Sequence, residues 1–252
     1  MQGAIYPSLK DRTVLVTGGG SGIGEAIVRQ FVGQGSRVGF IDIDAKASQQ
    51  LLASLPAGAS AHFEHADLRD IGALRRAIAG IRDALGPITI LVNNAARDDR
   101  HAIADVTPEY WDERFAVNLK HQFFSAQTVA PDMKQAGGGS IVNIGSVSWV
   151  IGQGNMPCYT TAKSAVQGLT RALARDLGPD NVRVNSILPG WIMTQRQLDN
   201  WLTPEAEAEL MQRQCIKRKL TPDDIARVVL FYAADDSGAC TNQNYIVDGG
   251  WV

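Results

Sequence analysis

Short apolar runs alternate with longer helical patterns over most of the chain. Most of the runs are rich in Val, Ile and Leu, as expected of strands that are buried on both faces. The predicted strands are residues 14–16, 37–41, 61–65, 88–92, 140–144, 182–188 and 244–247. The predicted helices are residues 22–34, 45–55, 71–85, 108–135 (with a break), 157–177 and 222–234.

This alternation predicts a fold of the α/β class. Strands that alternate with helices form parallel βαβ units, whose right-handed crossovers place helices on both faces of the sheet. The chain shows no internal repeat and no linker, so we expect residues 1–252 to form one Rossmann-like, doubly wound catalytic domain of about seven strands. Residues 191–220 break the alternation, and we expect this lid segment to be mobile and to cover the substrate site.

Composition narrows the classes of function. The 252 residues are 45% hydrophobic and 20% charged, which is ordinary globular usage. A net charge of −2 without a long basic stretch argues against a nucleic-acid partner, and no apolar run has membrane-spanning length. The N-terminus lacks the apolar core of a signal peptide, and the three cysteines match no zinc or redox spacing. We therefore expect a cytoplasmic protein with free thiols and no metal.

A glycine-rich loop follows the first predicted strand. This glycine loop, residues 17–24, reads Thr-Gly-Gly-Gly-Ser-Gly-Ile-Gly and opens the first helix. Glycines allow the backbone to approach a diphosphate, and the helix N-terminus offers that anion unpaired N–H groups. The expected contacts with a dinucleotide come from Gly18, Ser21, Gly22, Ile23 and Gly24.

Acidic and amide residues follow the next strands, at the edge where a dinucleotide would lie. Asp42 closes the second strand beside Ile43, where a carboxylate accepts hydrogen bonds from both ribose hydroxyls. No Lys or Arg is present there to bind a 2′-phosphate, which favours NAD over NADP. Asp67, next to Leu68, either binds the adenine amino group or caps the following helix. Asn94 and Ala95 end the fourth strand and either face the cofactor or only fix backbone carbonyls.

Tyr159 and Lys163 are four residues apart at the start of a long helix, which places them on one face. A phenol with an ordinary pKa near ~10 is a poor base at neutral pH. We expect the Lys163 ammonium, together with the positive nicotinamide, to lower the pKa of Tyr159 so that it accepts a proton from an alcohol. Ser146 follows the fifth strand and can hold the substrate oxygen, and Asn118 could anchor a water chain behind Lys163.

The ordered set of these motifs resembles the short-chain dehydrogenase/reductase superfamily over almost the whole chain. The matching pieces are the glycine loop, Asn93-Asn94-Ala95, Asn118, Ser146, Tyr159-x-x-x-Lys163 and Pro189-Gly190. The resemblance implies that Lys163 binds the nicotinamide ribose. It also implies that Pro189 and Gly190 border the nicotinamide, with Ile192 and Thr194 at its carboxamide. Ala96 departs from the common pattern, which has glycine there. The resemblance further implies a homotetramer assembled through the helices near 110–135 and 157–177 and the last strand.

A narrower resemblance concerns the substrate. Several stretches, among them residues 98–101, 110–114, 145–149 and 248–252, are similar to bacterial NAD-dependent aldose 1-dehydrogenases, including D-xylose 1-dehydrogenases. Such enzymes oxidise the C1 hydroxyl of a cyclic sugar to a lactone. Residues 150–156 differ from the xylose enzymes, so L-arabinose, D-galactose, L-fucose and other aldoses remain open. The candidate substrate residues are Ser146, Ser148, Trp149, Asn155, Tyr159, Trp191 and His101.

Two other classes of function compete with the sugar assignment. The first is an oxidoreductase that acts on an oxoacyl thioester or another secondary alcohol. The second is a dinucleotide-binding regulator without turnover. Ser146, Tyr159 and Lys163 together argue against the regulator.

Overall fold

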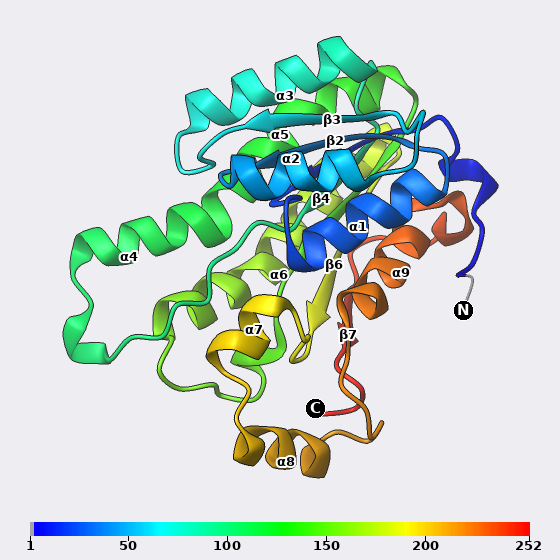
Figure 1. Ribbon diagram of the computed structural model, residues 1–252. Coiled ribbons are helices and arrows are strands. Elements are labelled where there is room, and N and C mark those ends of the chain that lie inside the picture. The colour runs from blue at the N-terminus through cyan, green and yellow to red at the C-terminus, as the bar shows by residue number, and fades with distance from the viewer. Residues whose placement is uncertain (1–2) are drawn as a thin grey trace.

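The computed structural model describes residues 3–252 and contains one seven-stranded sheet (Figure 1). All neighbouring strands run parallel, in the order β3-β2-β1-β4-β5-β6-β7. The strands are β1 (Thr13–Thr17), β2 (Arg37–Asp42), β3 (Ala61–His65), β4 (Ile90–Asn93), β5 (Gly139–Ile144), β6 (Val182–Pro189) and β7 (Asn244–Val247). The strand order reverses between β1 and β4, which leaves a crevice at their carboxyl ends. The predicted fold class is confirmed.

The helices follow the strands as predicted, with one division and two additions. They are α1 (Gly22–Gly33), α2 (Ala45–Ser54), α3 (Ile71–Leu85), α4 (Pro108–Phe115), α5 (His121–Gln135), α6 (Pro157–Leu177), α7 (Gln195–Asn200), α8 (Pro204–Arg213) and α9 (Pro222–Ala233). The expected break in 108–135 is a π-helical turn, Ala116–Lys120, between α4 and α5. The lid segment forms α7 and α8, which lie beyond the carboxyl end of β6 (Figure 1).

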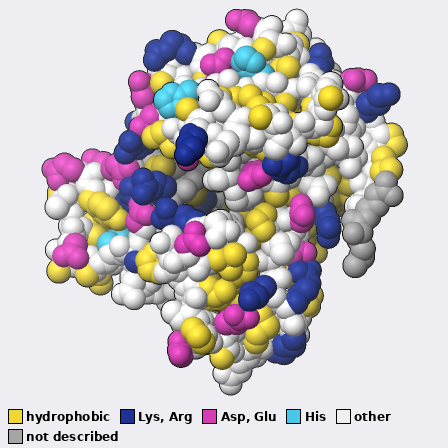
Figure 2. Space-filling view, viewed as in Figure 1, with side chains coloured by type: hydrophobic (Ala, Val, Ile, Leu, Met, Phe, Trp, Pro, Cys, Tyr) yellow, Lys and Arg dark blue, Asp and Glu magenta, His cyan; other side chains and the backbone are white. Residues whose placement is uncertain are grey.

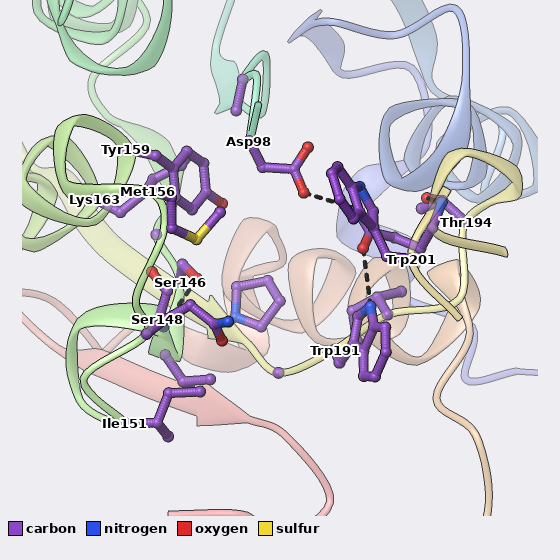
Figure 3. Close-up of a pocket in the computed structure, with 18 of the residues that line it drawn as sticks. Asp98, Ser146, Ser148, Ile151, Met156, Tyr159, Lys163, Trp191, Thr194 and Trp201 are labelled. Carbon is purple, nitrogen blue, oxygen red and sulfur yellow. Dashed lines mark hydrogen bonds between the residues drawn. The ribbon is translucent and has the colours of Figure 1, made fainter. Parts of the chain in front are cut away.

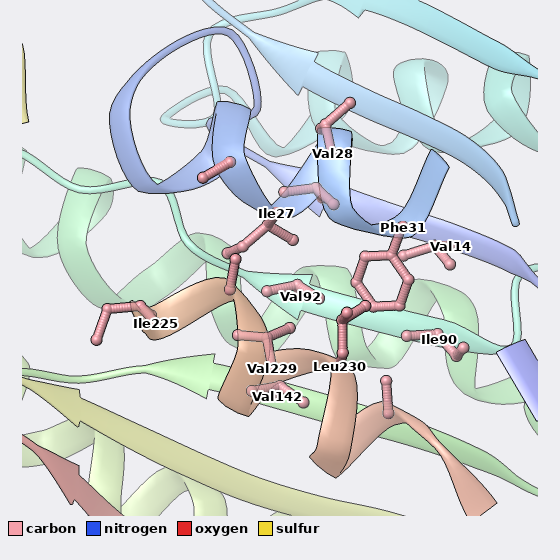
Figure 4. Packing of buried hydrophobic residues seen from close by; sticks show 14 of the residues in the cluster. Val14, Ile27, Val28, Phe31, Ile90, Val92, Val142, Ile225, Val229 and Leu230 are labelled. Carbon is pink, nitrogen blue, oxygen red and sulfur yellow. The ribbon is translucent and has the colours of Figure 1, made fainter. Parts of the chain in front are cut away.

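Two apolar layers enclose the sheet, because neighbouring residues of a strand point to opposite faces. Val14 and Val16 of β1 join a cluster with α1 and α9, whereas Leu15 joins a second cluster with α3, α5 and α6. Figure 4 shows Phe31 of α1 and Leu230 of α9 packed over the first face. This packing holds the carboxyl ends of β1, β4 and β5 in fixed positions at one edge. Across residues 3–252, the helices are all too short or too polar to cross a bilayer.

Candidate active site

A cavity of about 420 Å³ opens at the carboxyl edge of the sheet. That volume lies in the range of small-molecule sites. In Figure 2 this face of the molecule is hollowed, and basic and acidic side chains lie around the rim. The walls come from the turns after β4, β5 and β6, the start of α6, the lid segment and the C-terminus. Residues far apart in sequence therefore meet in one site.

The glycine loop is fixed by close backbone contacts. A Cβ on Gly24 would lie 1.8 Å from the Gly18 carbonyl oxygen, so a larger residue there would displace the loop. Gly18 has φ +65°, which disfavours side chains, and its own Cβ would lie 2.7 Å from Ala95. The Asn94 amide donates to the carbonyls of Thr17 at 3.1 Å and Gly18 at 2.8 Å. Asn94 thus fixes backbone carbonyls, which was one of the two predicted alternatives, and it also lines the cavity.

The loop leads directly into α1, and the other residues predicted there lie at this junction. Ser21 precedes the helix, and Gly22 and Ile23 form its first turn. Ile23 lines the cavity. A Cβ on Gly22 would approach Thr194 of the lid segment to 3.1 Å, so the lid segment reaches the loop. The N-terminus of α1 and the lid segment therefore lie in close contact beside the cavity.

Asp42 ends β2 against the glycine loop. Its Oδ2 accepts a hydrogen bond from the Gly20 N–H at 2.8 Å, and its Oδ1 accepts one from the Asp44 N–H at 2.9 Å. Ile43 follows with an exposed side chain. The carboxylate is therefore held against the glycine loop at the carboxyl end of β2.

Asp67 is occupied by a neighbouring cation. The Arg69 guanidinium donates to its two oxygens at 2.6–3.0 Å and holds the pKa of the carboxyl below its ordinary value. Asp70 caps α3 instead, accepting from Gly72 N–H at 2.7 Å and Ala73 N–H at 3.1 Å. The capping alternative for Asp67 is therefore wrong. Leu68 is buried in the second apolar cluster.

Tyr159, Lys163 and Ser146 meet in the cavity wall. Tyr159 and Lys163 lie one turn apart on α6, with the Lys163 Nζ 5.8 Å from the centre of the Tyr159 ring. The Nζ donates to the Ile144 carbonyl at 2.7 Å, which ties α6 to the end of β5. The Ser146 Oγ accepts a hydrogen bond from the Ser148 N–H at 3.1 Å, and the side chains of Ser146 and Tyr159 both line the cavity. Figure 3 shows these side chains on one side of the cavity, opposite Trp191 and Trp201.

In the protein alone, burial has the largest effect on the pKa values of Tyr159 and Lys163. It raises the pKa of Tyr159 to about 12, with the negative charge of Asp98 acting in the same direction and the Ser146 hydroxyl and the Arg100 cation opposing it. It lowers the pKa of Lys163 to about 7. The sequence predicted a lowered pKa for Tyr159, and for the protein alone that direction is wrong. The cost of removing a phenolate from water outweighs what the nearby groups of the chain return.

Asn118 is fully buried in the π-helical turn and does not line the cavity. Its Nδ2 donates to the Arg114 carbonyl, and its Oδ1 accepts from the Arg97 N–H, both at 2.9 Å. Asn118 therefore anchors the loop after β4 at the residue before Asp98.

The residues expected at the nicotinamide lie together at the end of β6 and directly after it. Pro189, Gly190, Ile192 and Thr194 all line the cavity. The Gly190 N–H donates to the Val247 carbonyl at 2.9 Å, and a Cβ there would lie 2.6 Å from the Asp248 side chain. Thr194 caps α7 by accepting from the Gln197 N–H. The turn is thus packed tightly against the C-terminal segment.

The candidate substrate residues divide into two groups. Ser146, Ser148, Tyr159 and Trp191 line the cavity. Trp149, Asn155 and His101 lie outside its lining. The His101 N–H donates to the Asn155 carbonyl at 2.8 Å, and its Nδ1 lies 3.0 Å from the Tyr110 hydroxyl, so these residues join two loops behind the wall.

Comparisons with known proteins bear on this geometry. A family model described as Enoyl-(Acyl carrier protein) reductase matches residues 18–252. The chain belongs to the short-chain dehydrogenase/reductase family. It is thus an oxidoreductase by family, and the resemblance drawn from the motifs is confirmed. In this dehydrogenase/reductase the matched region includes the glycine loop from Gly18, the Ser146–Tyr159–Lys163 set and the lid segment.

Relatives match this dehydrogenase/reductase over its length. A Rhizobium meliloti (strain 1021) protein named "Probable galactose dehydrogenase" is 52% identical over 97% of this chain and 96% of its own. A D-xylose 1-dehydrogenase of Caulobacter vibrioides is 47% identical over 100% of both chains. A solved 7α-hydroxysteroid dehydrogenase, in complex with NADH and 7-oxo glycochenodeoxycholic acid, superposes with a TM-score of 0.93 at 32% identity, covering 99% of this chain and 98% of its own.

Several cavity residues of the dehydrogenase/reductase were not named individually as substrate residues from the sequence. They are Asp98, Arg100, Ile151, Gln197, Glu209 and Trp251. The sequence held a signal for Trp251, because two glycines precede it. In the structure these glycines have φ of +72° and +80° and turn the chain back to the crevice. Gln197 and Glu209 sit on short polar helices, whose pattern does not say which face meets the cavity.

Proposed function

We propose that this protein oxidises the C1 hydroxyl of a cyclic aldose to the lactone, with NAD as the hydride acceptor. The observation that carries the proposal is the full-length similarity to two sugar dehydrogenases together with the Ser146–Tyr159–Lys163 set in one cavity. The opposite wall suits a sugar, because Trp191 and Trp201 offer flat apolar faces beside polar groups such as Gln197.

The residues of the crevice fit a dinucleotide. Only glycine fits at positions 18 and 24, and the N-terminus of α1 opens beside them, as a diphosphate requires. The Asp42 carboxylate would bind the adenosine ribose and repel a 2′-phosphate, which favours NAD over NADP. We expect Asp42→Ala to lower the preference for NAD over NADP by roughly 100-fold, measured as the ratio of kcat/KM values. An unchanged ratio would remove the assignment of Asp42.

The chain's own residues supply the proton chemistry. Ser146 would hold the substrate oxygen against Tyr159, and the Tyr159 phenolate would take the hydroxyl proton as the C1–H bond breaks. Bound NAD would supply the acceptor for the hydride and a positive ring charge. Burial raises the pKa of Tyr159 to about 12, so positive charge is needed beside it before a phenolate forms near neutral pH. Lys163 would hold the nicotinamide ribose and, while charged, add to the same effect.

We also propose a cytoplasmic homotetramer. Exposed apolar side chains lie on the elements that the family resemblance indicates, namely Trp111 and Phe123 on α4 and α5, and Tyr245 and Ile246 on β7. Such exposed groups are typical of surfaces that pair in an oligomer. Light scattering after gel filtration is expected to give four times the 27.1 kDa chain mass.

The test of the proposed function is a panel of aldoses with NAD, followed by the absorbance of NADH. We expect turnover with at least one pentose or hexose and formation of the lactone. The panel includes a simple secondary alcohol and, with NADH, an oxoacyl thioester. Turnover of either of these without turnover of any aldose would replace the sugar assignment by the more general alcohol or ketone oxidoreductase. Binding of NAD without turnover of any compound would favour the regulator.

A further inference from the structure

The carboxylate of Asp98 forms part of the cavity wall opposite α6 (Figure 3). Its Oδ2 accepts a hydrogen bond from the Gln197 Nε2 at 2.8 Å, and its Oδ1 accepts one from the Arg196 Nε at 3.2 Å. Arg100 lies 4.0 Å away, and 19% of the Asp98 side chain is exposed. The carboxylate is thus held by α7 and still faces the cavity.

A negative charge at this place opposes the proposed chemistry. The groups that shift the pKa of Tyr159 are Asp98 and Arg100 from the loop after β4 and Ser146 from the turn after β5. Lys163 on α6 lies over the Tyr159 ring, with its Nζ 5.8 Å from the ring centre. Asp98 raises the pKa of Tyr159 and therefore disfavours the phenolate, whereas Arg100 lowers it. The cavity has one other carboxylate in its lining, that of Glu209 on α8. The Asp98 carboxylate disfavours the Tyr159 phenolate and is nevertheless held in the cavity wall by hydrogen bonds. These observations together favour a function in substrate binding.

We propose that Asp98 is a specificity residue that accepts hydrogen bonds from sugar hydroxyls other than the one at C1. This inference rests on the proposed function. An ionised carboxylate is an acceptor only and has about four lone-pair sites, and side chains of α7 occupy one on each oxygen. The remaining sites suit hydroxyl donors. A sugar that lacks the matching hydroxyl would leave a desolvated carboxylate unpaired, and it would be discriminated against.

Gln197 acts in this scheme as a positioning residue. Its amide oxygen accepts from the Trp191 Nε1–H at 2.9 Å, which leaves its Nε2 directed to Asp98. The two hydrogen bonds, from Trp191 to Gln197 and from Gln197 to Asp98, connect the turn after β6 to the loop after β4. Asp98, which would bind the sugar hydroxyls, therefore also holds α7 of the lid segment.

The neighbouring residue provides a matched control. Asp99 pairs with Arg196 at 2.6 Å and with Arg97 at 3.2 Å, and it also contacts Arg114. Its carboxylate is not part of the cavity lining. Asp99→Asn therefore removes the same charge from the same loop without removing a group that could touch a sugar.

The experiment compares Asp98→Asn, Asp99→Asn and the wild type. The substrates are the aldose that the wild type oxidises best and its single-deoxy analogues at positions other than C1. In the wild type we expect kcat/KM to fall by roughly 10- to 100-fold for at least one analogue, as for a lost hydrogen bond to a charged group. We define the deoxy ratio as kcat/KM for the parent aldose divided by kcat/KM for that analogue. Asp98→Asn should reduce the deoxy ratio to about threefold or less, and Asp99→Asn should leave it at the wild-type value. If turnover is slow, the same ratio is taken from dissociation constants measured with NADH present.

The pH profile gives a readout that a purely structural role would not change. In Asp98→Asn the acid limb of kcat/KM should move to lower pH, because removing the negative charge favours the Tyr159 phenolate. A limb that stays in place would contradict the position assigned to Asp98. Gln197→Leu should partly reduce the deoxy ratio, with a larger change in KM than in kcat, and it replaces Asp98→Asn if that variant does not fold.

Oxidation of an aldose with an unchanged deoxy ratio in Asp98→Asn, or in Gln197→Leu where it replaces that variant, would overturn this inference alone. Absence of turnover with every aldose in the wild type would remove the proposed function and this inference together.

Discussion

The two sides of the cavity are held by different kinds of contact. On the cofactor side the glycine loop is fixed by backbone approach, with Gly24 so close to the Gly18 carbonyl that no side chain fits. On the other side, helix α7 of the lid segment is held to the loop after β4 by side chains, through Gln197 to Asp98 and through Arg196 to Asp98 and Asp99. Arg100 also lies over the Trp201 ring at 4.9 Å.

This difference indicates how proteins of one fold can bind the same cofactor and differ in substrate specificity. A backbone-held loop tolerates few substitutions, which suits a ligand that is the same throughout a family. A side-chain-held segment can be altered one residue at a time without moving the sheet. The cofactor side is therefore expected to respond to substitutions by losing NAD, and the lid side by changing the KM for the sugar.

The largest effect is expected at Tyr159, where the two sides meet. Tyr159→Phe removes the proton acceptor and should lower kcat by about 10³-fold or more. The dissociation constants of NAD and of the sugar should change by less than about threefold, because the ring itself remains. Steady-state kinetics and calorimetric titration measure the two quantities. A variant that retains substantial activity would refute the role of Tyr159.

On the cofactor side, Gly24→Ala should weaken NAD binding by roughly 100-fold or more, equivalent to about 3 kcal/mol. The added Cβ would lie 1.8 Å from a backbone oxygen, so the loop has to move. The control is Gly33→Ala in the same helix, where a Cβ would meet nothing within 4 Å. Titration of both variants with NADH measures the effect, and equal affinities would contradict the rigid-loop description.

The next effect concerns stability below neutral pH. His121 is fully buried, its Nε2 lies 3.0 Å from the Ala95 carbonyl oxygen, and burial lowers its pKa from 6.5 to about 3. Between these values the unfolded state binds a proton that the folded state does not. The free energy of unfolding should therefore decrease as pH falls through this window, by up to about 1.4 kcal/mol per pH unit.

Urea unfolding at several pH values measures this slope. His121→Gln should decrease the slope of the free energy of unfolding with pH by the contribution of up to one bound proton. His65→Gln, at an exposed position of β3, is the control. The same slope in His121→Gln and the wild type would show that His121 does not stay neutral in the folded protein.

On the lid side the smallest effect is expected from Trp191→Phe. This change removes the indole N–H that orients Gln197 and should raise the KM for the sugar about fivefold, with little change in kcat or in NAD affinity. Trp111→Phe, on α4 away from the cavity, is the control. A large loss of NAD affinity in Trp191→Phe would break the division between the two sides.

The same division explains how far the sequence could be interpreted. The strands, the glycine loop and the Tyr159–Lys163 pair were predictable because local rules set them, namely apolar runs, glycine at close approaches and one turn of helix. The roles of Asp98 and Gln197 were not, since their meeting depends on how two loops fold over the sheet. The pKa of Tyr159 was misjudged for a related reason, because burial is a property of the whole fold.

The most direct test of the account is a single turnover with an aldose that carries deuterium at C1. We predict that the deuterium appears in the reduced nicotinamide and that one lactone forms for each NADH. We also predict that Tyr159→Phe binds both ligands but transfers no more than traces of deuterium. NADH formed without deuterium, or no transfer from any aldose of the panel, would contradict it.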